Sequence, residues 1–158
     1  MAWRGSTTIK DRIFAALPYL LPIISGLEFG IFLFKQFPAL LVILIPLQPV
    51  LFIYQNIPFA GLVIFFLLFL LVVRNEKIAH FIRFNAMQAI LLDILLVLCS
   101  MLSQILLRGL GPNLITETLL NIIFLGTVAA CGYSIVQSLL GRYAEIPTLS
   151  EAVYAQVR

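Results

Sequence analysis

The sequence predicts an all-α integral membrane protein built as a four-helix transmembrane bundle. Its composition predicts this class, because 62% of the 158 residues are hydrophobic and 11% are charged. A soluble domain is about half apolar and a quarter charged, so a chain of this length cannot bury so much apolar surface in a water-soluble core. Long apolar runs between short polar gaps predict the spans. We expect the whole chain, 1–158, to form a single membrane domain.

The chain is expected to begin with a short amphipathic helix at 6–17 that leads into a first span at about 13–34. Serine and threonine precede apolar residues at helical spacing, which is typical of a capped entry helix at a membrane surface. The span itself carries two prolines and the Ser25-Gly26 pair. These residues favour a kinked or broken helix.

Segment 39–54 is apolar, but Pro46 and Pro49 interrupt it, and the next apolar run ends near Val73. A helix needs about 20 residues to cross a bilayer, and neither run is comfortably long enough alone. Two alternatives follow. Either both runs cross the membrane, or the first is a re-entrant or surface element that leads into one longer span.

The basic residues decide between these alternatives under the positive-inside rule. The spans predicted for four crossings are about 13–34, 56–73, 85–107 and 114–140. Only Lys35 and Arg108 then lie on one side of the membrane. The other side receives the remaining lysines and arginines, Arg4, Lys10, Arg12, Arg74, Lys77, Arg83, Arg142 and Arg158. A separate crossing of 39–54 divides them more evenly. We therefore predict four spans, a proline-broken element at 39–54 that does not fully cross, and both termini on the cytoplasmic or stromal side.

The polar stretch 74–83 is predicted to be the loop between the second and third spans. Its basic residues Arg74, Lys77 and Arg83 are expected to orient the protein, and contacts with anionic lipid headgroups are the alternative role for them. The polar tail 141–158 is expected to lie at the membrane surface and to hold a short helix.

The third span carries a polar stripe on one helical face. At about 100° per residue, its small and polar side chains share one arc, and the large aliphatic side chains point elsewhere. This arc contains Asn85, Asp93, Ser100, Ser103 and Gln104. We predict that it faces the bundle interior, because polar groups facing lipid are costly. Asp93 is either a functional intramembrane acid or a residue that only hydrogen-bonds a neighbouring helix.

Small residues recur every four positions in the fourth span, at Gly126, Ala130, Ser134 and Ser138. Such a ladder lets another helix approach closely. The partner helix is either internal or supplied by another subunit, as in a homo-oligomer.

The sequence contains no pattern typical of an enzyme or of a metal or cofactor site. It has one histidine, and its carboxylates are scattered singly. Cys99 and Cys131 lie inside apolar runs and are expected to pack as small buried thiols. The basic residues are spread between the spans, so they do not indicate nucleic-acid binding. We expect a non-enzymatic protein with no cofactor.

Three stretches match a known family: DRIFAALPYLLPI (11–23), VVRNEKIAHFIRFNAMQAILLDI (72–94) and GRYAEIPTLSEAVYAQV (141–157). With the spacing between them they cover nearly the whole chain. The chain resembles the Tic20 family, the four-span subunit of the chloroplast inner-envelope protein import translocon and its cyanobacterial and plastid-encoded relatives. Segment 39–54 departs from the family, because plant members are less apolar there. The N-terminus lacks the character of a transit peptide, which favours a cyanobacterial or plastid-encoded member.

The resemblance implies four helices with both termini on the stromal or cytoplasmic side, in a cyanobacterial plasma or thylakoid membrane or in the plastid inner envelope. It also implies a role in moving precursor proteins across that membrane, with membrane lipids, other translocon subunits and precursors as partners. The leading prediction is a translocon subunit whose precursor path is lined by the polar face of the third span and by the broken first span. One alternative is a small-solute channel or transporter, although no repeat symmetry is visible between the two halves. The other is a membrane scaffold that binds lipids and partner helices.

Overall fold

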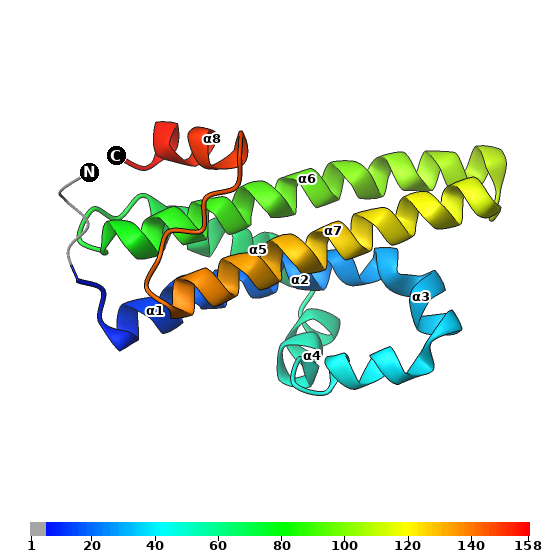
Figure 1. Ribbon diagram of the computed structural model, residues 1–158, viewed down its shortest axis with the longest axis horizontal. Coiled ribbons are helices and arrows are strands. Elements are labelled where there is room, and N and C mark those ends of the chain that lie inside the picture. The colour runs from blue at the N-terminus through cyan, green and yellow to red at the C-terminus, as the bar shows by residue number, and fades with distance from the viewer. Residues whose placement is uncertain (1–5) are drawn as a thin grey trace.

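The computed structural model describes residues 6–158, and the regular structure in this range is entirely helical. Figure 1 shows an elongated bundle in which the first span, α6 and α7 lie side by side. The elements, in chain order, are α1 (Ile9–Ala16), η1 (Leu17–Tyr19), α2 (Leu20–Gly26), η2 (Leu27–Gly30), α3 (Ile31–Gln36), η3 (Pro38–Leu44), α4 (Gln48–Asn56), α5 (Ala60–Leu67), η4 (Leu68–Val73), α6 (His80–Leu110), α7 (Leu114–Leu139) and α8 (Leu149–Gln156). The predicted helical membrane bundle is confirmed.

The first span is a single helical segment, Ile9–Gln36, long and apolar enough to cross a membrane. It begins with the predicted cap: the Thr8 hydroxyl oxygen accepts from the Asp11 N–H at 3.2 Å, and the Asp11 carboxylate accepts from the Thr8 N–H at 3.0 Å. The amphipathic helix α1 is present but continues directly into the span. The predicted break takes the form of two short 3-10 turns. The turn η1 contains Pro18, and proline removes a helical hydrogen bond. The turn η2 directly follows the Ser25-Gly26 pair.

The region after the first span contains the proline-broken element and a short helix. The axes of η3 and α4 meet at 80°, as expected for a segment interrupted by two prolines. The span predicted at 56–73 is realised as α5 and η4, which together cover Ala60–Val73 and are shorter than the ~20 residues of a full crossing. Three helical segments are thus long enough to span, and the bent pair makes a fourth only if both halves form one span.

The two longest helices form an antiparallel hairpin. The helix α6 has 31 residues and α7 has 26, and the turn between them contains Gly111 with a positive φ of 69°. Asn113 then caps α7 by accepting from the Ile115 and Thr116 N–H groups at 2.9 and 3.1 Å. The helix α6 begins at His80, earlier than the predicted start at residue 85, so the loop is 74–79 and Arg83 lies inside the helix.

The C-terminal segment packs against the bundle. Gly141 has a φ of 76°, which turns the chain back after α7. The following segment and α8 then cover the start of α6 (Figure 1). Ala144 and Val153 are fully buried there, and His80 packs against the ring of Tyr143. The predicted short helix in the tail is present as α8.

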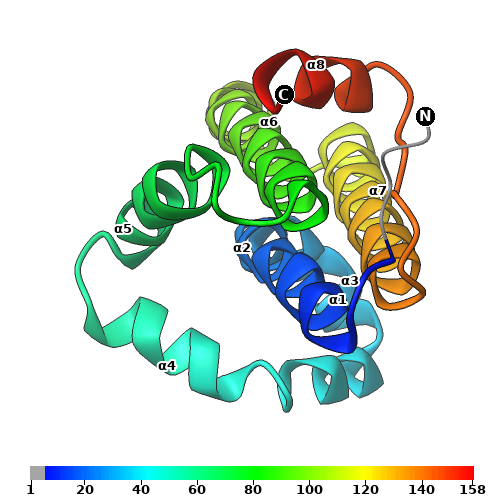
Figure 2. The same cartoon turned by 90° about the vertical axis from the view of Figure 1, so that its left-hand side faces the viewer.

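One end of the bundle collects the start of α1, the loop 74–79, the end of α7 and the helix α8 (Figures 1 and 2). The turn between α6 and α7 lies at the opposite end. The four-span prediction, based on counting basic residues, also requires these segments to lie on one side of the membrane. Arg4, which that count included, lies outside the described residues.

Candidate functional site

A closed network of polar side chains joins the first span, α6 and α7. Its centre is Asn85, which is fully buried. The Asn85 Oδ1 atom accepts hydrogen bonds from the Tyr19 hydroxyl at 2.8 Å and from the Ser138 hydroxyl at 2.9 Å. The Asn85 Nδ2 atom donates to the Phe81 carbonyl oxygen at 2.8 Å. One amide on α6 therefore binds both neighbouring helices, and its polar atoms are paired away from lipid.

Gln88, one turn further along α6, extends this network to the C-terminal segment. Its Nε2 atom donates to the Tyr19 hydroxyl oxygen at 3.0 Å and to the Ala144 carbonyl oxygen at 2.8 Å. Its Oε1 atom accepts from the Ser150 hydroxyl at 3.0 Å, and the Ser150 oxygen accepts from the Ile146 N–H at 2.7 Å. Gln88 is fully buried. Removing its amide would leave these partners unpaired in an apolar environment.

The network joins residues from the three stretches of sequence that carry the family resemblance. The stretch 11–23 supplies Tyr19, the stretch 72–94 supplies the two α6 amides, and the stretch 141–157 supplies their C-terminal partners. Residues far apart in the chain thus meet as hydrogen-bond partners. These hydrogen bonds hold the fold together. The amides of Asn85 and Gln88 are fully buried and already paired.

Asp93 lies two turns further along α6, in a different setting. It is buried, with 7% of its surface exposed, and its carboxylate accepts a hydrogen bond from the Ser25 hydroxyl of α2. It also borders a cavity of about 380 Å³ between α2, α5 and α6. The cavity is lined by Ser25, Gly61, Leu62, Phe65, Asp93, Ile94, Val97 and Leu98. The partner of the acid is a hydroxyl rather than a cation, so its oxygens keep the capacity to accept further hydrogen bonds.

The far part of the predicted polar stripe bonds mainly to its own helix. Ser103 is buried, and its hydroxyl donates to the Ser100 carbonyl oxygen at 2.8 Å. Gln104 is exposed, and its Nε2 atom lies 3.4 Å from the Ser100 hydroxyl. The structure therefore places Asn85, Asp93 and Ser103 in the interior, Ser100 half-buried, and Gln104 on the outside of the bundle.

The three basic residues predicted to act together occupy two different environments. Arg74 and Lys77 are exposed in or beside the loop 74–79. Arg83 is buried with 9% exposure, so it does not lie among headgroups. Its Nε atom donates to the Val73 carbonyl oxygen at 2.9 Å, and its Nη1 atom donates to the Arg158 carbonyl oxygen at 3.1 Å. Arg83 thus ties the end of η4 and the chain terminus to α6.

The comparison with protein families identifies the fold's relatives. The family model for "Chloroplast import apparatus Tic20-like" matches residues 8–153. The chain belongs to the Tic20-like family. A Tic20 family protein of Synechocystis is 52% identical over 100% of this chain and 99% of its own length. The Arabidopsis thaliana protein TIC 20-II, chloroplastic, is 36% identical over 96% of this chain and 74% of its own length. The Porphyra purpurea Tic20 family protein Ycf60 is 33% identical over 97% of this chain and 78% of its own length.

The region that matches the Tic20-like family contains the buried network and Asp93. The predicted resemblance is therefore confirmed. The relatives named as chloroplastic link the family to plastids, and the Synechocystis relative links it to cyanobacteria. This family is associated with chloroplast protein import.

Two members of the predicted ladder in this Tic20-like chain, Ser134 and Ser138, are fully buried, while Gly126 and Ala130 are not. A Cβ atom built on Gly126 would meet nothing within 4 Å, and Ala130 is only half-buried. The buried side of α7 consists of Thr116, Leu120, Phe124, Thr127, Cys131, Ser134 and Ser138. A Cβ on Gly26 would lie 2.7 Å from the Thr127 Cγ2 atom. Gly26 of the first span thus lies close to α7 because it has no side chain.

Sequence reasoning missed this contact, although a signal for it exists. Gly26 and Gly30 are separated by three residues, which is the small-xxx-small spacing of close helix pairs in membranes. A Cβ on Gly30 would lie 2.8 Å from the Phe124 Cε2 atom. Gly26 and Gly30 on the first span let it approach α7, where the ladder residues Ser134 and Ser138 are also buried.

Within residues 6–158, no group of three or more histidine, cysteine, aspartate or glutamate side chains is placed to hold a metal ion. Cys131 is buried and Cys99 half-buried, and both are free thiols. What the Tic20-like chain offers chemically is the buried carboxylate of Asp93 beside a mostly apolar cavity.

Proposed function

We propose that this protein is a non-enzymatic, multi-pass subunit of a complex that moves precursor proteins across a membrane. Membership of a family described as chloroplast import apparatus supports this role. The observation that indicates where the precursor would pass is the position of Asp93, an acid in the candidate spanning helix α6 at the edge of a cavity. Ionisable residues inside membranes are costly, and by default they indicate a substrate pathway or a polar contact.

The precursor-facing surface is the Asp93 cavity rather than the whole polar face of α6. The amides of Asn85 and Gln88 are fully buried and already paired, so they support the fold. The carboxylate of Asp93 has one hydroxyl partner and lies beside open space. The short helix α5 forms the opposite wall of this space. A precursor segment that enters there would meet apolar side chains and one polar acceptor.

Site-specific photo-crosslinking tests this placement. A photoreactive residue at Leu62, which lines the cavity, is compared with one at Leu125 on α7, because both side chains are 56% exposed. The probe is a precursor arrested during transport by a tightly folded C-terminal domain. We expect precursor adducts from position 62 and none from position 125. Adducts from position 62 only to other membrane proteins would instead favour the scaffold, and equal precursor adducts from both positions would refute the placement.

Substitution of Asp93 tests the role of the acid. Asp93→Leu is expected to abolish precursor transport without preventing membrane insertion, because it removes the one carboxylate beside the cavity. Transport is measured in membranes where this chain replaces the resident relative, and Gln104→Leu on the outside of α6 is the control. Unchanged transport at normal protein level would remove Asp93 from the mechanism.

A further inference from the structure

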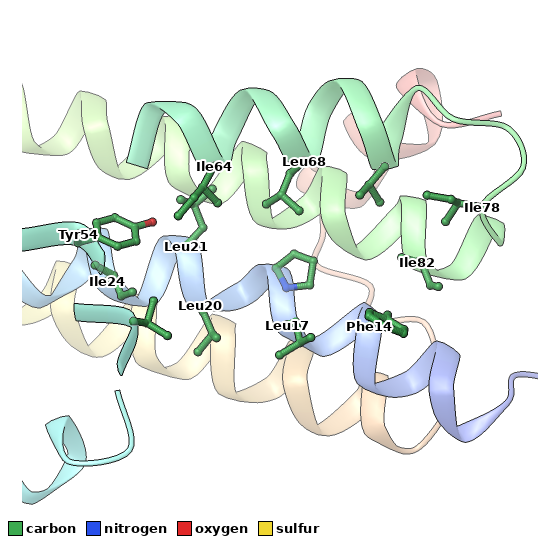
Figure 3. Close-up of a pocket in the computed structure, with 13 residues that line it drawn as sticks. Phe14, Leu17, Leu20, Leu21, Ile24, Tyr54, Ile64, Leu68, Ile78 and Ile82 are labelled. Carbon is green, nitrogen blue, oxygen red and sulfur yellow. The ribbon is translucent and has the colours of Figure 1, made fainter. Parts of the chain in front are cut away.

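A larger apolar groove lies between the first span and the short helix formed by α5 and η4. Its volume is about 560 Å³. One wall is the stretch Phe14–Ile24, and the facing wall is Ile64–Val72 (Figure 3). Every lining side chain is hydrocarbon except Tyr54, whose hydroxyl points into the groove at one end. The groove is separate from the Asp93 cavity, because the two share no lining residue.

The length of the groove matches one leaflet of a bilayer. The wall from Phe14 to Ile24 rises roughly 15 Å at 1.5 Å per residue, which is about half of the ~30 Å hydrocarbon core. The end beside the loop 74–79 is lined by Ile78 and Ile82. The other end, at Ile24, therefore lies near the middle of the membrane.

The lining of the groove favours a hydrocarbon occupant. Its volume of about 560 Å³ and its length of roughly 15 Å accommodate an extended acyl chain. In a membrane, the surrounding solvent supplies such chains.

Basic residues surround the loop end of the groove. Lys10 lies one helical turn before Phe14, and Lys77 precedes Ile78. Arg74 directly follows η4. All three basic side chains are exposed, and Glu76 is the exposed acid in the same loop. The mouth of the groove thus carries an excess of positive charge, which attracts anionic lipid headgroups.

We propose that this groove binds one acyl chain of an anionic lipid from the leaflet on the side of the loop 74–79. The chain lies between the first span and α5–η4, and the headgroup contacts Lys10, Lys77 and Arg74. The site accounts for a hydrocarbon-lined space of one-leaflet length beneath a basic mouth. It does not depend on the transport role proposed above.

The Tyr54 hydroxyl distinguishes the proposed lipid, whose headgroup lies at the loop end, from a ligand whose polar group lies at the deep end of the groove. The hydroxyl oxygen is buried and has no hydrogen-bond partner within residues 6–158. A ligand with a polar group at the deep end of the groove would bond to it, whereas an acyl terminus would not. Tyr54→Phe therefore leaves lipid binding unchanged if the headgroup lies at the mouth, and weakens binding if a polar group lies deep.

Native mass spectrometry of the full chain measures the bound lipid. The protein is delipidated and then equilibrated with vesicles of phosphatidylglycerol and phosphatidylcholine in equal amounts. We expect retained phosphatidylglycerol in excess over phosphatidylcholine. The double variant Lys10→Gln, Lys77→Gln is expected to reduce that preference roughly fivefold per lysine, and Lys35→Gln, at the far end of the first span, is expected to leave it unchanged. Equal retention of both lipids, or no effect of the double variant, overturns the proposal.

Two further experiments test whether the acyl chain lies in the groove. Leu68→Trp fills the groove and is expected to remove the bound lipid, while Leu70→Trp on the exposed side of the same helix retains it. A phosphatidylglycerol with a photoreactive acyl chain provides a readout that does not require a variant. Its adducts are expected on peptides from 14–24 and 64–72. Adducts spread evenly over the lipid-facing residues of α6 and α7 would overturn the site.

Discussion

Two glutamines on α6 illustrate how one residue type serves two purposes in this chain. Gln88 is fully buried and makes three hydrogen bonds, to Tyr19, Ala144 and Ser150. Gln104 is exposed, and its side chain bonds to Ser100 on its own helix. Buried polar networks specify a unique packing only when their members are satisfied. The difference between the two positions is therefore measurable as stability.

Gln88→Leu is expected to lower the free energy of unfolding by about 2 kcal/mol, from three hydrogen bonds at about 0.6 kcal/mol each in a membrane protein. Gln104→Leu is expected to change it by less than about 0.5 kcal/mol. Unfolding of the purified protein by SDS in mixed micelles measures both values. Equal midpoints for the two variants would show that the network does not stabilise the fold.

Arg83 is a second residue whose role depends on remote partners. Arg83→Gln removes the bond to the Arg158 carbonyl oxygen and weakens the one to Val73. We expect faster hydrogen exchange in α8, because the chain terminus is released from α6. Arg74→Gln, at an exposed position, serves as the control. Mass spectrometry of peptides from 149–156 gives the rates, and identical rates in both variants would argue against this tether.

At the scale of elements, the sequence predicts what depends on local pattern and misses what depends on distant partners. The apolar runs give α7 within one residue, and the paired prolines give the bend between η3 and α4. The early start of α6 was missed because the charge of Arg83 suggested a loop. Its guanidinium donates hydrogen bonds to the carbonyl groups of Val73 and Arg158, which periodicity does not reveal. The same limit applies to Asp93, since its interior position follows from the stripe, while its Ser25 partner and cavity require the fold.

Because of the contact between the first span and α7, alanine substitutions at Gly26 and Gly126 are expected to change stability in opposite directions. Gly26→Ala places a Cβ 2.7 Å from the Thr127 Cγ2 atom, and the resulting overpacking is expected to destabilise the protein by about 1–3 kcal/mol. Gly126→Ala meets open space and is expected to stabilise it by up to about 1 kcal/mol through helix propensity. The same SDS titration compares them. Stabilisation by both substitutions would mean that the two helices do not approach closely at Gly26.

At the scale of the whole molecule, the distribution of basic residues and the path of the chain both favour one orientation in the membrane. The helix α6 has 31 residues and is therefore about 46 Å long, which exceeds the ~30 Å hydrocarbon core. Its two ends must lie on opposite sides if it crosses. The loop 74–79 and the C-terminal segment share one end (Figure 1). Because basic residues gather at that end, we predict from the positive-inside rule that it lies in the cytoplasm or stroma.

Cysteine accessibility tests this orientation. In a Cys99→Ala, Cys131→Ala background, single substitutions Glu76→Cys, Arg108→Cys and Thr148→Cys each lie at an exposed position. A membrane-impermeant maleimide added to sealed right-side-out vesicles is expected to label only Arg108→Cys, and permeabilised vesicles are expected to be labelled at all three. Labelling of Glu76→Cys and Thr148→Cys alone would reverse the orientation. Labelling of Glu76→Cys together with Arg108→Cys in sealed vesicles would show that α6 does not cross, and the four-span arrangement would fall with it.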